Sequence, residues 1–299
     1  MPFRFRCNES VTKNVRRIAT EQIKGAIADL SDPASDRVEA IHQARKRCKQ
    51  IRGLIRLVRP SMRDVYDLEN AHFRDASRKL SGLRDADAML EAWHAFREYG
   101  GSEMNASVTD SVTDNLTKYR ETVAEEGFDL DPRIDAFVFE MRVALERVPH
   151  WKLQKKGAKA IQAGFYNTYH RGELAMTAAC KLRTDENFHE WRKRVKYHGY
   201  HLRLLRDLHE KKFRKRAMRL KELSDLLGDD HDLAVLRKLL MEHPDWTGSP
   251  SGLFEAIHAI DHRRFGMQHD AIWLGVDCYT YLAKPYRDSV AKRLAAWLQ

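Results

Sequence analysis

The stretch HQARKRCKQIRGLIRLVRP, from His42 to Pro60, combines the apolar pattern of a core helix with a dense run of positive charge. Its apolar residues recur at intervals of three and four, and they are Ile41, Ala44, Cys48, Ile51, Ile55 and Val58. That spacing places them on one face of an α-helix. Ser35 or Asp36 can cap the first turn, and Pro60 ends the helix because it lacks the backbone N–H. The sequence therefore predicts a core helix.

Basic residues form a second row beside the apolar one, displaced by one position. This row consists of His42, Arg45, Lys49, Arg52, Arg56 and Arg59. A solvated helix face normally alternates acids and bases four residues apart, yet no Asp or Glu occurs between His42 and Arg59. An anionic ligand would relieve the repulsion among these like charges. We interpret the row, roughly 25 Å long at the rise of an α-helix, as a surface for a linear polyanion.

The same pattern recurs 147 residues later in HEWRKRVKYHGYHLRLLRD, which begins at His189. Identical residues at equivalent positions are His42/His189, Arg45/Arg192, Lys46/Lys193, Arg47/Arg194, Lys49/Lys196, Arg56/Arg203, Leu57/Leu204 and Arg59/Arg206. The second apolar row is Phe188, Trp191, Val195, Leu202 and Leu205, and the second basic row is His189, Arg192, Lys196, Arg203 and Arg206. Gly199 stands where the first copy has Arg52.

A further motif follows each basic helix: LSGLRDADAMLEAW begins at Leu80 and LSDLLGDDHDLAVL at Leu223. The repeated order indicates an internal duplication. We predict two similar helical bundles, residues 1–145 and 150–299. Asp87 and its counterpart Asp232 are expected to pair with a nearby arginine and so fix helix geometry.

The composition indicates an all-α fold. The chain has 299 residues, 43% hydrophobic, with 15 glycines and 8 prolines, and it is long enough to bury a sizeable core. Helix-forming residues dominate, and no long stretch alternates as a β-strand would. Loops are expected at 98–111 (EYGGSEMNASVTDS) and 244–252 (PDWTGSPSG), and a helix over 133–148 completes the first bundle.

Charge and cysteine usage narrow the class of partner. The formal net charge of +10 favours an anionic partner such as nucleic acid, a membrane surface or polyphosphate. The four cysteines are far apart in the sequence, which argues against a disulfide framework and favours a reducing, cytoplasmic compartment. The start, MPFRFRCNES, has no apolar leader segment, and no apolar run has the length of a membrane span. No membrane association is expected.

The two basic helices and the motifs after them resemble the CHAD family, the conserved histidine α-helical domain. Its pattern is an H-x-x-R-K-x-x-K-x-x-R helix followed by an L-G-x-x-R-D-x-D element, occurring twice. The matching residues here are His42, Arg45, Lys46, Lys49, Arg52, Arg84, Asp85 and Asp87, then His189, Arg192, Lys193, Lys196 and Asp232. FYNTYHRGE (165–173) resembles the helix that opens the second half of the family. Gly199 and Ser81 depart from the pattern.

This resemblance covers nearly the whole chain and implies one CHAD domain over 1–299. It implies two pseudo-twofold-related bundles of long antiparallel helices around a basic central groove or pore that binds inorganic polyphosphate. It also implies a cytoplasmic protein, at polyphosphate granules, without catalytic activity or cofactor. The implied polyphosphate-binding residues are His42, Arg45, Lys46, Lys49, Arg52, Arg56, Arg84, Tyr169, Arg171, His189, Arg192, Lys193, Lys196, Arg203 and Arg206.

Two alternative functions remain open. A nucleic-acid-binding protein would also use basic rows, but stacking on bases would need aromatic residues among the cations. The first row has none, whereas Tyr197 and Tyr200 lie in the second helix. An enzyme acting on phosphoanhydrides is the other alternative. The sequence contains neither of the glycine-rich phosphate-binding motifs G-x-x-x-x-G-K-[ST] and G-x-G-x-x-G. DDHD (229–232) and the His258/His262 pair lack a complete set of metal ligands, so no metal site is expected.

Overall fold

The computed structural model describes residues 3–32, 34–80, 82–99, 104–125, 130–208 and 210–297. Within these ranges the regular structure is helical and no strand occurs, which confirms the all-α prediction. The first six helices are α1 (Val11–Ser31), α2 (Arg37–Val58), α3 (Arg63–Lys79), α4 (Gly82–Tyr99), α5 (Ala106–Glu125) and α6 (Leu130–Arg147). The others are α7 (Ala158–Lys181), α8 (Asp185–Leu204), α9 (Glu210–Glu242), α10 (Pro250–Cys278) and α11 (Ala283–Trp297). None of these helices could cross a membrane, because none is both long and apolar enough.

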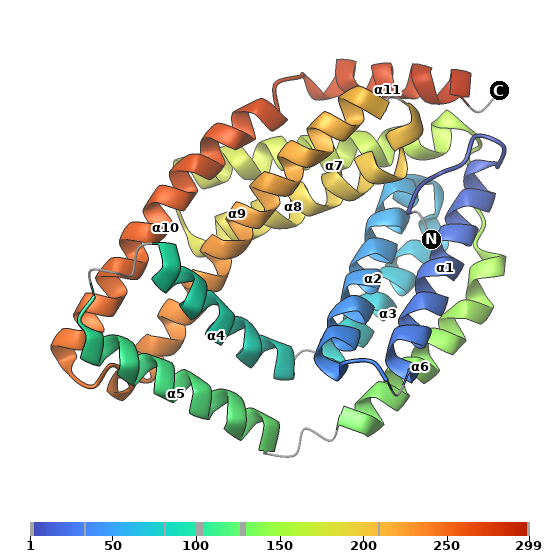
Figure 1. The fold of residues 1–299 in the computed structure, drawn as a ribbon. Coiled ribbons are helices and arrows are strands. Elements are labelled where there is room, and N and C mark those ends of the chain that lie inside the picture. Colours follow the sequence, from blue (N-terminus) through green and yellow to red (C-terminus); the bar gives the residue numbers. More distant parts are fainter. Residues whose placement is uncertain are drawn as a thin grey trace.

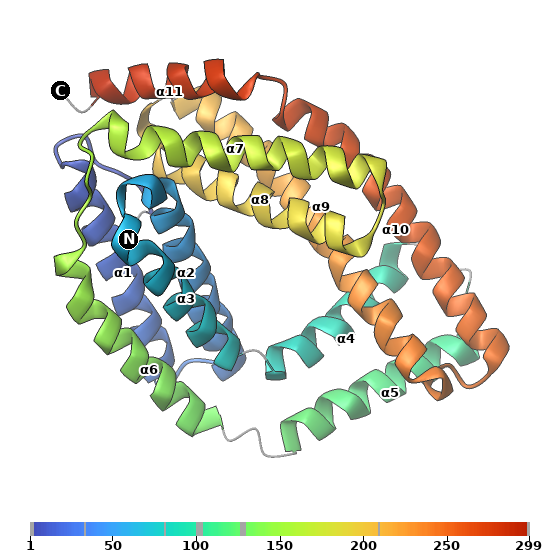
Figure 2. The ribbon, with the colours of Figure 1, turned by 180° about the vertical axis from the view of Figure 1, so that it is seen from behind.

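The helices α1, α2, α3 and α6 form one bundle (Figures 1 and 2). In α2 the carboxylate of Asp36 accepts a hydrogen bond from the backbone N–H of Glu39 at 2.9 Å, so Asp36 is the cap. The predicted apolar row is buried at all six positions, and a single turn of 3₁₀-helix at Arg59–Ser61 follows α2. Both the helix and its buried face are confirmed.

A second group contains α7, α8, α9, α10 and α11. The side chain of Thr184 caps α8 by accepting from the backbone N–H of Asn187 at 3.3 Å. All five residues of the second apolar row are buried. The two basic helices are therefore both core helices, one in each group, and α2 packs against α7 and α8 where the groups meet.

The helices α4 and α5 extend away from the first bundle and reach the second group (Figure 1). They pack on each other, and α4 packs on α9. A second core forms there around Trp93, Val112, Leu236 and Ile260. These contacts join sequence segments on either side of the predicted boundary, so the division into 1–145 and 150–299, and the pseudo-twofold relation, remain predictions. Arg120 donates to Asp87 at 2.6 Å, which confirms an arginine partner for this aspartate.

The loop expected at 98–111 is wrong over 98–99, which end α4, and over 106–111, which belong to α5. Asn105 caps this helix, because its side chain accepts from the N–H of Ser107 at 3.0 Å. Val108 and Val112 are buried in the second core, so packing outweighs the weak helix propensity of this segment. Residues 100–103 lie outside the described part of the chain. The loop at 244–252 is also shorter than expected, since α10 begins at Pro250, whereas the helix over 133–148 is confirmed as α6.

Candidate anion-binding site

The helices α2 and α8 cross at Gly53. A Cβ atom at this position would lie 2.8 Å from the side chain of Tyr200, so the missing side chain allows the close approach. His201 is fully buried, and its Nε2 donates to the backbone carbonyl of Gly53 at 3.1 Å. This crossing brings the two basic rows next to each other.

Lys49 of α2 lies close enough to Lys196 of α8 for its charge to affect the pKa of Lys196. Burial, together with the charges of Arg192 and Lys49 in that order of importance, lowers the pKa of Lys196 to about 8. The carboxylates of Asp232 and Asp225 act in the opposite direction but do not offset this effect. A depressed lysine pKa means that the fold holds this positive charge in a place where it is destabilised. Both rows therefore contribute to one region of positive potential.

His189, the first residue of the second row, lies against His231 of α9, with ring centroids 4.4 Å apart. Burial lowers the pKa of His189, and so do Lys193 and Arg192. Its Nδ1 is buried and has no hydrogen-bond partner among the described residues. No third ligand joins the two histidines into a metal-binding group in that part of the chain.

Gly228, in the LLGDD segment of α9, faces Arg192. A Cβ atom here would lie 3.2 Å from Nη2 of Arg192. The glycine lets the guanidinium lie against the α9 backbone, and the Nε of Arg192 is buried there without a hydrogen-bond partner among the described residues. The motif after the second basic helix therefore positions a residue of that helix.

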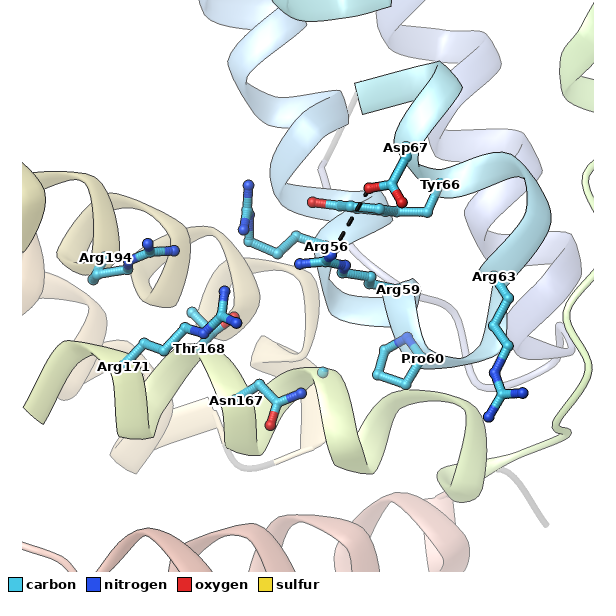
Figure 3. Close-up of a pocket in the computed structure, with 11 residues that line it drawn as sticks. Arg56, Arg59, Pro60, Arg63, Tyr66, Asp67, Asn167, Thr168, Arg171 and Arg194 are labelled. Atoms are coloured by element: carbon cyan, nitrogen blue, oxygen red, sulfur yellow. Dashed lines mark ion pairs between the residues drawn. The ribbon is translucent and has the colours of Figure 1, made fainter. Parts of the chain in front are cut away.

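A pocket of about 340 Å³, here called the first arginine pocket, lies where α2 ends against α7 and α8 (Figure 3). Its lining residues are Arg56, Arg59, Pro60, Arg63, Tyr66, Asp67, Gly164, Asn167, Thr168, Arg171 and Arg194. Five of these are arginines and one is an acid, Asp67, which lies 3.8 Å from Arg59. Burial lowers the pKa of Arg171, and the nearby guanidiniums of Arg194, Arg59 and Arg56 add to the effect.

A second arginine pocket, of about 350 Å³, lies where α8 ends against α1 and α2. It is lined by Phe3, Gln22, Gln43, Lys46, Arg47, Gln50, Arg203 and Arg206. The sequence repeat pairs its Arg203, Arg206 and Arg47 with Arg56, Arg59 and Arg194 of the first pocket. Each basic row thus ends in a pocket to which the other basic helix contributes one arginine. Arg47 is in addition paired with Asp29 at 2.7 Å.

Two of the predicted binding residues, Tyr169 and Arg84, are not among the described residues that line these pockets. Tyr169 is completely buried, and its hydroxyl donates to the backbone carbonyl of Tyr281 at 2.8 Å, so it faces the core between α7 and the start of α11. The side chain of Arg84 lies outside the described residues.

The remaining predicted residues occupy α2 and α8. Arg52 donates from Nε to Oδ1 of Asn70 in α3 at 3.1 Å, while Lys193 pairs with Glu190 at 2.5 Å. His42 and Lys46 are exposed, and Arg45 is half-buried.

The sequence reasoning missed several residues of the site. Arg194 and Arg47 carried a usable signal, because the repeat matches them to each other. Arg63 and Tyr66 carried none, because they lie beyond Pro60 and reach the pocket only through the turn between α2 and α3. The sequence presents His231 only as part of the DDHD segment, and no residue spacing indicates its contact with His189.

The family model of the CHAD domain matches residues 17–241. The chain belongs to the CHAD family. Among solved structures, this CHAD domain is similar to PptA from Streptomyces chartreusis, with a TM-score of 0.64 and 13% identity over 91% of this chain and 100% of that one. It is also similar to the CHAD domain from the plant Ricinus communis, with a TM-score of 0.57 and 17% identity over 99% and 97% of the two chains. No curated protein sequence matches it. At these identities the structural likeness establishes the fold.

Proposed function

We propose that this CHAD domain binds inorganic polyphosphate along the basic rows of α2 and α8. The observation that carries the proposal is the pKa of Lys196, which burial and the charges of Arg192 and Lys49 lower to about 8. Positive charges from both rows repel one another at the crossing, and a polyanion lying there would replace this repulsion by attraction. Each arginine pocket adds the cations at the end of one basic row, Arg56 and Arg59 in the first pocket and Arg203 and Arg206 in the second.

The tyrosines near the crossing favour polyphosphate over nucleic acid as the ligand. Arg56 lies over the ring of Tyr197, 4.2 Å from its centroid, and Tyr200 packs against Gly53 and edge-on to Phe3. Their rings are thus engaged within the protein, whereas stacking on a base requires an accessible ring face. Polyphosphate has no base and needs only the cations.

In this function the domain is a binding module without catalysis that works in the cytoplasm at polyphosphate granules. Incubation with the protein should leave the chain-length distribution of polyphosphate unchanged on a gel. A shift to shorter or longer chains would instead favour an enzyme acting on phosphoanhydrides.

Long-chain polyphosphate should displace single- and double-stranded DNA from the protein at physiological salt. The affinity for polyphosphate should fall steeply with salt, with a slope of about −0.7 in log K against log salt for each contact of a single-stranded polyanion. Six contacts would give a slope of about −4. Competition measured by fluorescence anisotropy tests the proposal, and equal affinity for DNA and polyphosphate would contradict it.

The affinity for polyphosphate should decrease as the pH rises above about 8, the pKa of Lys196 in the free protein. The bound polyanion favours the charged lysine and raises its pKa. Below pH 8 the lysine is charged in both states and contributes no pH dependence. Between the free and bound pKa values, binding takes up a proton, so the affinity falls with rising pH. Calorimetry at pH 7, 8 and 9 measures this change.

Lys196→Arg provides the matched variant for the pH experiment, because arginine stays charged throughout this range. The decrease in polyphosphate affinity between pH 8 and 9 should be smaller in this variant, whereas it should be unchanged in Lys193→Arg. An unchanged pH profile in Lys196→Arg would remove Lys196 from the site.

A further inference from the structure

A third cavity, of about 820 Å³, lies between the first half of α9 and α11, with the end of α10 beside it. It is larger than either arginine pocket. Its described lining includes five cations, from Lys212 to Arg293, and a single acid, Asp277. The cavity belongs to neither basic row, since its residues come from α9, α10 and α11 and from the connection between the last two helices.

Arg216 stands in this cavity within a group of tyrosines. Its guanidinium carbon lies 4.7 Å from the ring centroid of Tyr281, 4.8 Å from that of Tyr286 and 5.8 Å from that of Tyr169. Such cation–π contacts hold a guanidinium in place while leaving its charge uncompensated. No carboxylate of the described residues forms an ion pair with Arg216. A half-buried cation in this setting favours an anionic group on a ligand.

The same cavity offers an apolar wall, which the two arginine pockets provide to a much smaller extent. Leu282 and Tyr281 are 76% and 54% exposed at its edge, and Val290 lines it from α11. Tyr281 stacks on Tyr286, with centroids 5.6 Å apart and an interplanar angle of 25°. An exposed aromatic and an exposed aliphatic side chain at the edge of a cavity can bury an organic ring or chain.

We propose that the cavity between α9 and α11 binds an organic anion, whose apolar ring or chain lies against Tyr281, Leu282 and Val290 and whose phosphate or carboxylate reaches Arg216, Lys212 and Arg293. The chemical class is an anion with an apolar body, such as a nucleoside monophosphate or a medium-chain fatty acid. Inorganic polyphosphate lacks such a body and would leave the apolar wall unused. The site is therefore distinct from the basic rows and can be tested independently of them.

Calorimetry on the full chain at physiological salt can test this site with three probes: AMP, decanoate and inorganic phosphate. We expect AMP, decanoate or both to bind saturably, and inorganic phosphate to bind at least tenfold more weakly than the better of the two. Binding of AMP alone identifies an organic phosphate, and binding of decanoate alone identifies a carboxylate amphiphile. Leu282→Ser should weaken binding several-fold without unfolding the protein, because the side chain is mostly exposed.

The double variant Lys212→Glu/Arg293→Glu should weaken the binding of the organic anion at least tenfold. Both residues are exposed, so the fold should persist. The matched control is Lys211→Glu/Lys292→Glu, which makes the same charge change one position earlier on each helix, about 100° away. Saturating long-chain polyphosphate should not displace the organic anion. The proposal is overturned if neither organic anion binds, if inorganic phosphate binds as tightly, if polyphosphate displaces them, or if the control weakens binding equally.

Discussion

Replacement of Arg45, Lys49 and Arg56 by alanine should weaken polyphosphate binding about 100-fold, even though the α8 row remains intact. The expectation follows from the crossing of α2 and α8, where the charge of Lys49 contributes to the lowered pKa of Lys196. If both rows bind one ligand, the loss of three of the six residues in the α2 row reduces the affinity of the whole site. Three contacts at about 1 kcal/mol each, the upper range for exposed ion pairs, correspond to about two orders of magnitude in Kd.

The control for this triple variant removes three exposed cations elsewhere, Lys24, Lys118 and Arg142, so that the net charge changes equally. It should retain nearly all of the affinity. Circular dichroism must show unchanged helix content in both variants, because arginine stems also contribute packing. Two independent sites would instead leave half of the binding capacity in the triple variant at the original affinity.

The sequence was sufficient to predict the two basic helices because the relevant signals are local. In α2 the cap at Asp36, the buried face and the end before Pro60 all follow from residue type and spacing. The positions of the basic rows beside these buried faces follow from the same periodicity. The repeat in turn supported the interpretation of α8, although Gly199 interrupts its basic row.

The packing of α4 and α5 could not be predicted in the same way. Val108 and Val112 of α5 belong to the same buried cluster as Leu236 and Ile260, which lie more than a hundred positions later in the chain. Nothing in residues 98–111 signals that partner, and Ser, Thr and Val are weak helix formers. The segment therefore resembled a loop, although tertiary contacts make most of its second half helical.

The composition of the two arginine pockets could not be predicted from the sequence either. Spacing assigns Arg56 and Arg203 to basic rows, but it does not reveal which helix packs beside the end of each row. Arg63 reaches the first pocket through the turn at Pro60, and Arg171 reaches it from α7. For Tyr169 the family resemblance implies a binding residue. In the structure its side chain is buried, and its hydroxyl donates a hydrogen bond to the backbone carbonyl of Tyr281.

Gly164→Ala should strongly destabilise the protein and weaken polyphosphate binding with it. A Cβ atom at Gly164 would lie 1.9 Å from the backbone oxygen of Leu57 and 2.9 Å from that of Arg56. Backbone atoms of a buried helix cannot move aside as a flexible side chain can, so α7 must shift away from the end of α2. Overpacking of this kind typically destabilises by about 1–3 kcal/mol, and more where the backbone must move.

Because Gly164 lines the first arginine pocket, the shift should also separate Arg171 on α7 from Arg56 on α2. Thermal unfolding should show a Tm lower by several degrees, about 2–4 °C per kcal/mol for a chain of this size class, and titration of the folded variant should show weaker binding. Gly199→Ala is the matched control, because a Cβ there meets nothing within 4 Å. Alanine is the better helix former by about 0.5–1 kcal/mol, so the control should raise the Tm slightly. An equal rise for Gly164→Ala would show that α7 does not contact the α2 backbone, and the first arginine pocket would then lose its α7 wall.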